Sequence, residues 1–306
     1  MATPSPLLRL GTRGSPLALA QANLVVAALR AAHGWDEDAI AIVPIRTSGD
    51  RIQDRPLAEV GGKALWTREL DRALLAGEID CAVHSMKDVE TERPPAIAIA
   101  AFLPRADVRD RLIGAATLAA LPAGARVGTS SPRRSAQILR ERPDAQIVLF
   151  RGNVATRLAK LARGEADATL LAAAGLDRLS EHDVGQPIPL ETMLPAPAQG
   201  AVGIELRADD DRRLGWFAAI DDVPTRTAVI TERALLAGLG ADCRSPVAAL
   251  AEPRADGIRL RAEILSGGGE ECYAADQVIA RPEDAAEVAA ELLGRASPAV
   301  RALFHP

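Results

Sequence analysis

Arginine is the side chain that this sequence offers most often for binding chemistry. Of its 36 basic residues, 33 are arginines and only three, Lys63, Lys87 and Lys160, are lysines. The guanidinium group donates hydrogen bonds in a planar fork that matches a carboxylate or a phosphate. The excess predicts recognition of an anion, although a general bias of the genome toward arginine would give the same count.

Two consecutive arginines, Arg133 and Arg134, follow Ser131 and Pro132, which can cap and begin a helix. The first turn of a helix already carries partial positive charge, so two guanidinium groups there are unfavourable unless an anion binds. The pair therefore indicates an anion site, with two solvated arginines as the alternative.

Three further arginines occupy similar positions where an apolar run meets a helical pattern. Arg151 ends such a run, Arg157 lies about one turn inside the next helix, and Arg13 precedes a helix that Ser15 can cap. In open α/β sheets, ligands bind beyond the carboxyl ends of the strands. These loops predict a ligand with several carboxylates or phosphates, and the residues alone do not choose between the two.

A polar segment follows the apolar run at 79–83, and we expect it to form a loop that contains His84, Ser85, Lys87 and Asp88. Asp88 is suited to stabilising a cation or transferring a proton, and Lys87 to neutralising an acidic ligand. An ordinary surface ion pair between them is the alternative. We expect His84 to be structural.

Of the three cysteines, Cys243 is the candidate for a functional thiol. It follows a helix in a loop where Arg244 favours the thiolate and Asp242 opposes it. We expect Cys81 to be an inert core residue within a strand, and Cys272 to be unreactive because its acidic neighbours raise its pKa. Neither the cysteines nor the four histidines form a metal-binding pattern, so no metal is expected.

The elements that must position these residues are alternating strands and helices. Apolar runs and helical patterns alternate up to about residue 196, and a Pro- and Gly-rich segment then leads into a smaller region after about residue 222. The first helix has clear ends, since Ser15 can cap it, Pro16 suits its first position and Gly34 its C-terminal cap. The pattern predicts two α/β domains and a smaller α+β domain.

Composition narrows the class of protein. A net charge of −5 argues against general binding to nucleic acid or membranes. No run of eighteen apolar residues is present, and the first residues lack the pattern of a signal peptide. We therefore expect a cytoplasmic protein.

Taken together, the segments GTRGSPLALAQ, TSGD, GGKALWTREL, AVHSMKDV, GTSSPRRSAQI, FRGNVATRL, LAAAGLDRL, QGAVGIE and DCRSPVA resemble the porphobilinogen deaminase family in sequence, order and spacing. The resemblance runs from about residue 8 to about residue 250. It implies an α/β fold with two domains similar to type 2 periplasmic binding proteins, with the active cleft between them, and a smaller α+β C-terminal domain. The implied boundaries are 1–104 with 198–220, 105–197, and 221–306.

The resemblance also implies an activity and its cofactor. Members of the family condense four porphobilinogen molecules head to tail with loss of ammonia, and then release hydroxymethylbilane, in haem and tetrapyrrole biosynthesis. By resemblance, Cys243 carries a dipyrromethane cofactor through a thioether, and Asp88 is the catalytic carboxylate. The implied partners are a small-molecule substrate only, and the implied state is a monomer.

The remaining site residues are assigned by resemblance alone, as groups that bind acetate and propionate side chains. Those beside the cofactor are Lys87, Asp88, Ser131, Arg133, Arg134 and Arg151, and those for the substrate are Arg13, Ser15, Lys63, Arg151, Arg157, Arg178 and Gln199. Lys63 resembles the lysine of a mobile active-site loop, although its position after two glycines fits a plain turn equally well. Asp242 and Ala198 stand where the family usually has glycine.

Two other functions fit part of the pattern. A non-catalytic protein that traps a small polyanion between two domains would use the same arginine loops. A thiol-dependent transferase acting on a phosphorylated substrate would use Cys243 without a bound chromophore.

Overall fold

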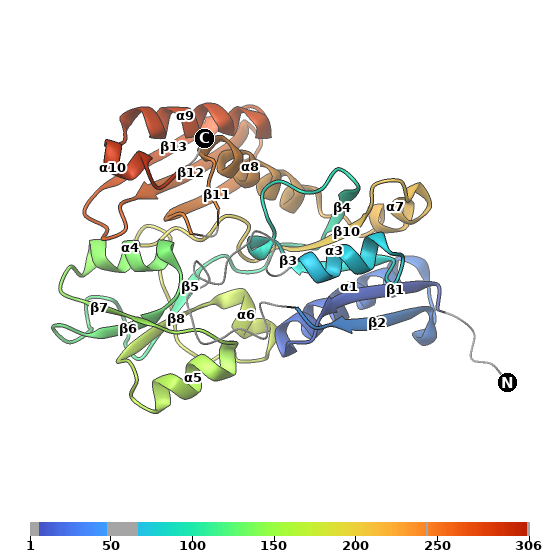
Figure 1. The fold of residues 1–306 in the computed structure, drawn as a ribbon, viewed down its shortest axis with the longest axis horizontal. Helices are drawn as coiled ribbons and strands as arrows, with labels where there is room; N and C mark the ends of the chain where they lie inside the picture. Colours follow the sequence, from blue (N-terminus) through green and yellow to red (C-terminus); the bar gives the residue numbers. More distant parts are fainter. Residues whose placement is uncertain (1–5, 48–66, 243, 305–306) are drawn as a thin grey trace. The chain divides into compact units, whose positions relative to one another are not determined.

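The computed structural model describes residues 6–47, 67–242 and 244–304. The chain divides into two compact units. Of the described residues, unit 1 comprises 6–47, 67–105 and 201–226, and unit 2 comprises 106–200, 227–242 and 244–304. Figure 1 gives the element labels used below.

Unit 1 is a five-stranded sheet in the order β2-β1-β3-β10-β4. Its strands are β1 (Leu8–Arg13), β2 (Ile40–Ile45), β3 (Cys81–Ser85), β4 (Ile97–Phe102) and β10 (Val202–Arg207). Strands β2, β1 and β3 are parallel, whereas β10 lies antiparallel between β3 and β4. The sheet is therefore completed by a strand that follows it by about a hundred residues in the sequence.

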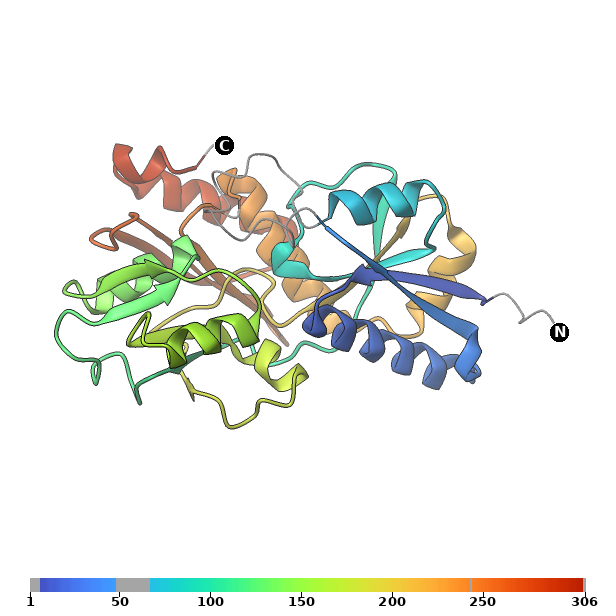
Figure 2. The ribbon, with the colours of Figure 1, turned by 60° about the horizontal axis from the view of Figure 1, so that its bottom comes forward.

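Helices cover both faces of this sheet, as Figure 2 shows for α1 and α3. Helices α1 (Pro16–His33) and α7 (Asp211–Ala218) pack on one face through side chains such as Val25 and Phe217. Helix α3 (Arg68–Leu75) packs on the other face through Leu70 and Leu74. Successive strand residues point to opposite faces, which divides the apolar side chains of β3 between the two cores.

The ends of α1 follow from its sequence as predicted. Ser15 caps the helix, its Oγ accepting a hydrogen bond from the backbone N–H of Ala18 at 3.3 Å, and Pro16 occupies the first turn. Gly34 ends it in the left-handed region at φ 66°, and its N–H bonds to the carbonyl oxygen of Arg30. The Ser15 cap and Pro16 therefore determine where α1 begins after β1.

Unit 2 contains a second five-stranded sheet, in the order β7-β6-β8-β5-β9. Its strands are β5 (Asp110–Ile113), β6 (Arg126–Thr129), β7 (Gln146–Leu149), β8 (Ala168–Ala172) and β9 (Gln186–Pro187). Strands β7, β6 and β8 are parallel, and β5 is antiparallel to β8 and β9. Its helices are α4 (Pro132–Glu141), α5 (Val154–Ala162) and α6 (Ala173–Arg178).

A smaller antiparallel sheet completes unit 2, with the strands β11 (Val247–Arg254), β12 (Gly257–Leu265) and β13 (Cys272–Ile279). Helices α8 (Val223–Leu239), most of which belongs to this unit, and α9 (Ala285–Arg295) pack on one face through an apolar core that includes Leu235, Leu260 and Leu292. A short helix, α10 (Pro298–Arg301), follows. The other face contacts α4, because Gln137 donates to Glu263 on β12 at 3.1 Å.

The predicted fold class is confirmed: two α/β sheet-and-helix assemblies precede a smaller C-terminal sheet with helices. The three-domain division with its boundaries stays a prediction. One local expectation was wrong, because His84 and Ser85 lie in β3 rather than in a loop. Pairing with β10, through Gly203 opposite His84 and Val202 opposite Ser85, extends the strand to these polar residues.

Candidate active site

A pocket in unit 1 lies beside the carboxyl ends of β1 and β3. It is lined by residues of β1, α1, β3 and the turn that follows β3: Arg13, Ser15, Leu17, Ala18, Gln21, Val83, His84, Ser85 and Asp88. Because β1 and β3 are parallel neighbours, their last residues meet at one edge of the sheet. Three predicted residues, Arg13, Ser15 and Asp88, are thereby brought into one pocket.

Asp88 belongs to a single 3-10 turn, Met86–Asp88, directly after β3. The turn is anchored by Met86, which is 1% exposed and whose N–H donates to the carbonyl oxygen of Ala201 at 3.1 Å. Gly203 makes room for it, because a Cβ there would lie 2.1 Å from Met86 Sδ. Asp88 is half-buried, and among the described residues no hydrogen-bond partner of its carboxylate is found. Its oxygens are therefore available to a ligand.

Helix α1 brings an unpredicted residue into the pocket. Gln21 is 3% exposed, and its Nε2 donates to Ser85 Oγ at 2.6 Å. The sequence carried a signal for it, since Gln21 interrupts the apolar stripe formed by Ala18, Ala22 and Val25.

A buried charge cluster lies behind the pocket. Glu205 on β10 is fully buried, and both its oxygens accept hydrogen bonds from Arg93 at 2.8 Å. Its Oε2 lies 3.2 Å from Nε2 of His84, a close contact whose angles fall short of a hydrogen bond. Arg93 also pairs with Asp71 at 2.5 Å and with Glu90 at 2.9 Å. An acidic residue inside the apolar strand VGIEL was the available signal for this cluster.

The pKa of Glu205 reflects these contacts. Burial alone would raise it, but the His84 ring and the Arg93 guanidinium together outweigh burial and lower the pKa to about 2. Glu205 therefore stays ionised at neutral pH, and His84 is fixed at the floor of the pocket. His84 is buried in this cluster, in line with the structural role expected for it.

In unit 2, the predicted arginines lie beyond the carboxyl ends of three parallel strands. Ser131, Arg133 and Arg134 follow β6, Arg151 follows β7, and Arg178 ends the helix after β8. Ser131 caps α4, because its Oγ accepts from the backbone N–H of Arg134 at 3.4 Å. The sheet topology alone thus gathers these side chains at one edge.

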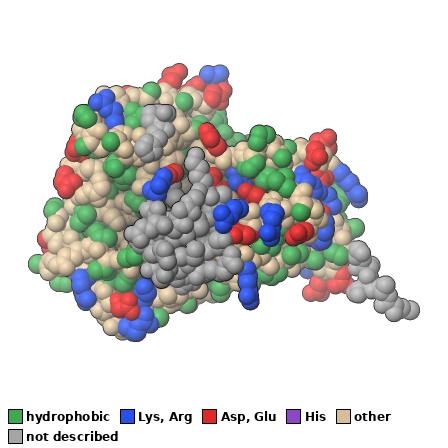
Figure 3. All heavy atoms as spheres, in the orientation of Figure 1, with side chains coloured by type: hydrophobic (Ala, Val, Ile, Leu, Met, Phe, Trp, Pro, Cys, Tyr) green, Lys and Arg blue, Asp and Glu red, His purple; other side chains and the backbone are tan. Residues whose placement is uncertain are grey.

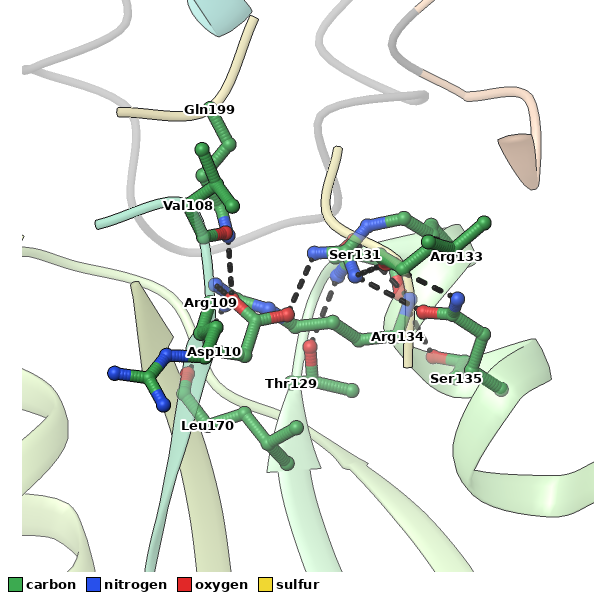
Figure 4. Close-up of polar contacts among 12 residues, drawn as sticks. Val108, Arg109, Asp110, Thr129, Ser131, Arg133, Arg134, Ser135, Leu170 and Gln199 are labelled. Carbon is green, nitrogen blue, oxygen red and sulfur yellow. Dashed lines mark hydrogen bonds and ion pairs between the residues drawn. The ribbon is translucent and has the colours of Figure 1, made fainter. Parts of the chain in front are cut away.

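Arg133 and Arg134 share one buried carboxylate, as Figure 4 shows. Arg133 Nη2 lies 2.8 Å from Asp110 Oδ2, and Arg134 Nη2 lies 2.7 Å from Asp110 Oδ1. All three side chains are buried, and Asp110 begins β5. Asp110 could not be identified from the sequence, because its partners follow it by more than twenty residues.

The other predicted residues of this unit have backbone partners. Arg157 Nε donates to the carbonyl oxygen of Gly152 at 3.0 Å, and Arg178 Nη2 donates to that of Gly200 at 2.7 Å. Gln199 is fully buried, and its Nε2 donates to the carbonyl oxygen of Val108 at 2.8 Å. Burial lowers the pKa of the Arg178 guanidinium, which nevertheless remains charged.

Burial distinguishes Arg133, Arg134 and Arg151 from most other arginines in the described part of the chain. On the coloured part of the face in Figure 3, basic and acidic side chains are interspersed. Typical exposed pairs are Arg163 with Glu165 at 2.6 Å and Arg295 with Glu291 at 3.1 Å. Such pairs need no ligand to explain them, whereas a buried guanidinium requires a specific partner.

Not every predicted residue can be placed. Lys63 and Cys243 lie outside the described residues, and Lys87 is exposed beside the pocket. Cys81 is fully buried, as expected of a core residue. The pKa of Cys272 is raised, as expected, but burial is the first cause and Glu263, rather than its sequence neighbours, the second.

No group of three or more His, Cys, Asp or Glu side chains that could hold a metal ion occurs in residues 6–47, 67–242 and 244–304. Within the same ranges, no helix has both the length and the apolar character needed to cross a bilayer.

Each unit therefore places charged side chains beyond the carboxyl ends of its parallel strands, which defines the class of α/β proteins that bind small ligands at that edge. The chain belongs to the porphobilinogen deaminase family. Residues 8–214 match the family's dipyrromethane cofactor-binding domain, and residues 226–295 match its C-terminal domain.

Curated relatives agree with this assignment over nearly the whole chain. The porphobilinogen deaminase of Sphingopyxis alaskensis is 59% identical, covering 99% of this chain and 98% of the relative. The porphobilinogen deaminase of Paracoccus denitrificans is 51% identical, covering 97% and 96%.

Solved periplasmic binding proteins match part of the chain. A substrate-binding protein of an ABC transporter from Coxiella burnetii matches with a TM-score of 0.43 at 16% identity, covering 72% of this chain and 94% of that one. A His/Glu/Gln/Arg/opine family-binding protein from Silicibacter pomeroyi, in complex with lysine, matches with a TM-score of 0.38 at 19% identity, covering 70% and 88%.

Proposed function

We propose that this chain condenses four porphobilinogen molecules head to tail with loss of ammonia and releases hydroxymethylbilane, using a dipyrromethane group bound through Cys243. Family membership over both matched domains supports the reaction class. The observation that carries the residue assignment is the unit 1 pocket, where the half-buried Asp88 lies with Arg13 and Ser15 at the ends of two parallel strands.

The residues of unit 2 fit the dipyrromethane group chemically. Its acetate and propionate side chains are carboxylates, which guanidinium groups bind best. The Nε atoms of Arg133 and Arg134 are buried without a hydrogen-bond partner among the described residues, so the pair retains donors beyond those that Asp110 uses. We assign Ser131, Arg133, Arg134 and Arg151 to this group, which when bound supplies the free pyrrole carbon to which new units are joined.

Asp88 acts on the incoming substrate. As ammonia leaves, the carbon–nitrogen bond of the aminomethyl group breaks and positive charge spreads over the methylene carbon and the pyrrole nitrogen. The Asp88 carboxylate accepts a hydrogen bond from the pyrrole N–H and stabilises that charge where it develops. Arg13 and Ser15 hold the acidic side chains of the substrate, so that its ring is oriented toward the carboxylate. Lys87 is assigned to the acidic side chains of the dipyrromethane group.

The other predicted groups contribute binding. Arg157, Arg178 and Gln199 lie in unit 2 near the ends of the parallel strands and are assigned to the growing chain. Lys63 is assigned to the substrate by resemblance. We also propose that the protein acts as a cytoplasmic monomer and uses neither nucleic acid nor membrane, which light scattering and cell fractionation would test.

Intact-protein mass spectrometry tests the cofactor. The wild-type protein should exceed its encoded mass by two pyrrole units, and Cys243→Ser should lose this excess. Cys272→Ser, a matched change at a half-buried thiol, should keep it. A fully active wild type with only its encoded mass contradicts the proposal.

Turnover of porphobilinogen tests Asp88. Asp88→Asn should keep the mass excess while kcat falls by about 10²–10³-fold, the range for loss of a group that stabilises transition-state charge. The exposed Asp38→Asn in the same unit is the control and should leave kcat unchanged. Ligand binding without turnover in either wild type or Asp88→Asn would favour a polyanion-binding protein instead.

A further inference from the structure

The carboxylate of Asp110 organises the arginine pair from inside unit 2. Asp110 is 2% exposed, and each of its oxygens accepts a hydrogen bond from a different guanidinium group, Arg133 on Oδ2 and Arg134 on Oδ1. Figure 4 shows both arginines turned toward it. Because the two arginines are consecutive, their like charges would repel in a buried site without this carboxylate.

Further contacts allow the pair only one arrangement. Arg133 Nη1 also donates to Gln137 Oε1 and to the carbonyl oxygen of Leu194, both at 2.9 Å. Arg134 Nη1 donates to the carbonyl oxygen of Leu170 at 3.0 Å. Guanidinium groups with fixed planes are preorganised donors, and preorganisation lowers the cost of binding a carboxylate.

Gln199 secures the same carboxylate from the other side. Its Nε2 donates to Asp110 Oδ1 at 2.9 Å, so this oxygen accepts from both Gln199 and Arg134.

The backbone next to Gln199 is itself held, because the N–H of Ala198 donates to Glu232 Oε2 at 2.5 Å. Glu232 lies on α8, the helix that precedes the Cys243 loop in the sequence. Five residues before Gln199, the carbonyl oxygen of Leu194 accepts a hydrogen bond from Arg133.

We propose that Asp110, supported by Gln199, is the positioning residue of the arginine pair: it fixes Arg133 and Arg134 in one arrangement and neutralises one of their two positive charges, so that the other acts on the acidic side chains of the bound pyrroles. The inference deepens the proposed function and rests on it. Two effects can be separated. The net charge of the arginine pair depends on the Asp110 carboxylate, whereas the orientation of the two guanidinium groups depends on both Asp110 and Gln199.

Steady-state kinetics of the cofactor-loaded enzyme with porphobilinogen separate these effects. In Asp110→Asn the pair carries two positive charges, so KM should rise with salt at least about twice as steeply as in wild type, because screening acts on a larger charge. Its kcat should fall about tenfold or more, because the donors lose their fixed orientation. Asp110→Glu should restore the salt dependence but not kcat.

Gln199→Met keeps every charge and removes the hydrogen bonds to Asp110 and Val108. It should lower kcat several-fold with the salt dependence of wild type. The control is Asp144→Asn, another Arg-paired aspartate in unit 2 but at the surface, where it pairs with Arg142 and should leave all parameters unchanged.

Two results overturn the inference. Asp110→Asn that loses thermal stability but keeps the kcat, KM and salt dependence of wild type would make Asp110 merely structural. If the Asp110 variants do not fold, Gln199→Met tests the inference in their place. A kcat equal to that of wild type in Gln199→Met would reject it. A wild type that neither gains mass nor turns over porphobilinogen would instead reject the proposed function.

Discussion

Replacing Glu205 with Gln should destabilise unit 1 by about 3 kcal/mol at pH 7. The carboxylate is fully buried, and the pKa of Glu205 falls from its usual 4.5 to about 2 because the contacts with His84 and Arg93 outweigh burial. Each pH unit of this difference corresponds to about 1.4 kcal/mol. Asp71 and Glu90 still hold Arg93 in the variant, so we do not expect the larger loss that follows when a buried charge is left alone.

The effect must depend on pH in one direction. A carboxyl group with a lowered pKa stabilises the folded state above its unfolded-state pKa, and this contribution is lost as the pH falls through the folded-state value. The difference between wild type and Glu205→Gln should therefore be full above about pH 4.5 and should shrink toward zero near pH 2, where wild-type Glu205 becomes protonated.

Tryptophan fluorescence during urea unfolding measures this in the full chain. The three tryptophans, Trp35, Trp66 and Trp216, all lie outside residues 106–200 and 227–306, so the signal does not report on these parts of unit 2. The exposed Glu78→Gln is the control and should match wild type at every pH. A difference below about 1 kcal/mol at pH 7, or one that does not change between pH 7 and pH 3, would refute the reasoning.

Two further predictions concern the backbone. Ala198→Gly should stabilise unit 2 by up to about 1 kcal/mol, because Ala198 has φ 61°, a conformation that glycine adopts more easily. Gly200→Ala should instead destabilise unit 2 by more than about 2 kcal/mol, because at φ 86° a Cβ would lie 2.6 Å from the carbonyl oxygen of Ala106. Circular-dichroism melts measure both changes, and equal melting temperatures in the two variants would refute this. Ser15→Ala should lower the stability of unit 1 by about 1 kcal/mol through loss of the α1 cap, measured by tryptophan fluorescence, and an unchanged midpoint would show that the cap contributes nothing.

Features set by neighbouring residues could be predicted from the sequence. Ser15, Pro16 and Gly34 define the ends of α1 because capping and left-handed geometry act within a few residues. Asn153 likewise caps α5, accepting from the N–H of Thr156 at 2.9 Å. The edge at which the arginines gather followed from the alternation of strands and helices.

Features set by distant pairing could not be predicted. The extension of β3 through His84 and Ser85 depends on β10, more than a hundred residues later. Likewise, the first turn of α4 identified Arg133 and Arg134 but not their carboxylate, because no local periodicity connects a helix to Asp110 in an antiparallel strand. The sequence marks Glu205 and Gln21 only as polar residues within apolar stretches, which does not identify their partners.

The placement of β10 has a consequence for synthesis of the protein. The strand lies between β3 and β4, so until residues 202–207 have left the ribosome β3 is paired only with β1, and β4 lacks the strand with which it pairs. In a nascent chain ending near residue 105, one edge of β3 and both edges of β4 are unpaired, and unpaired strand edges favour aggregation. Folding of the unit 1 pocket should therefore await translation of residues 106–200, and fragments that stop before β10 should require a chaperone to stay in solution.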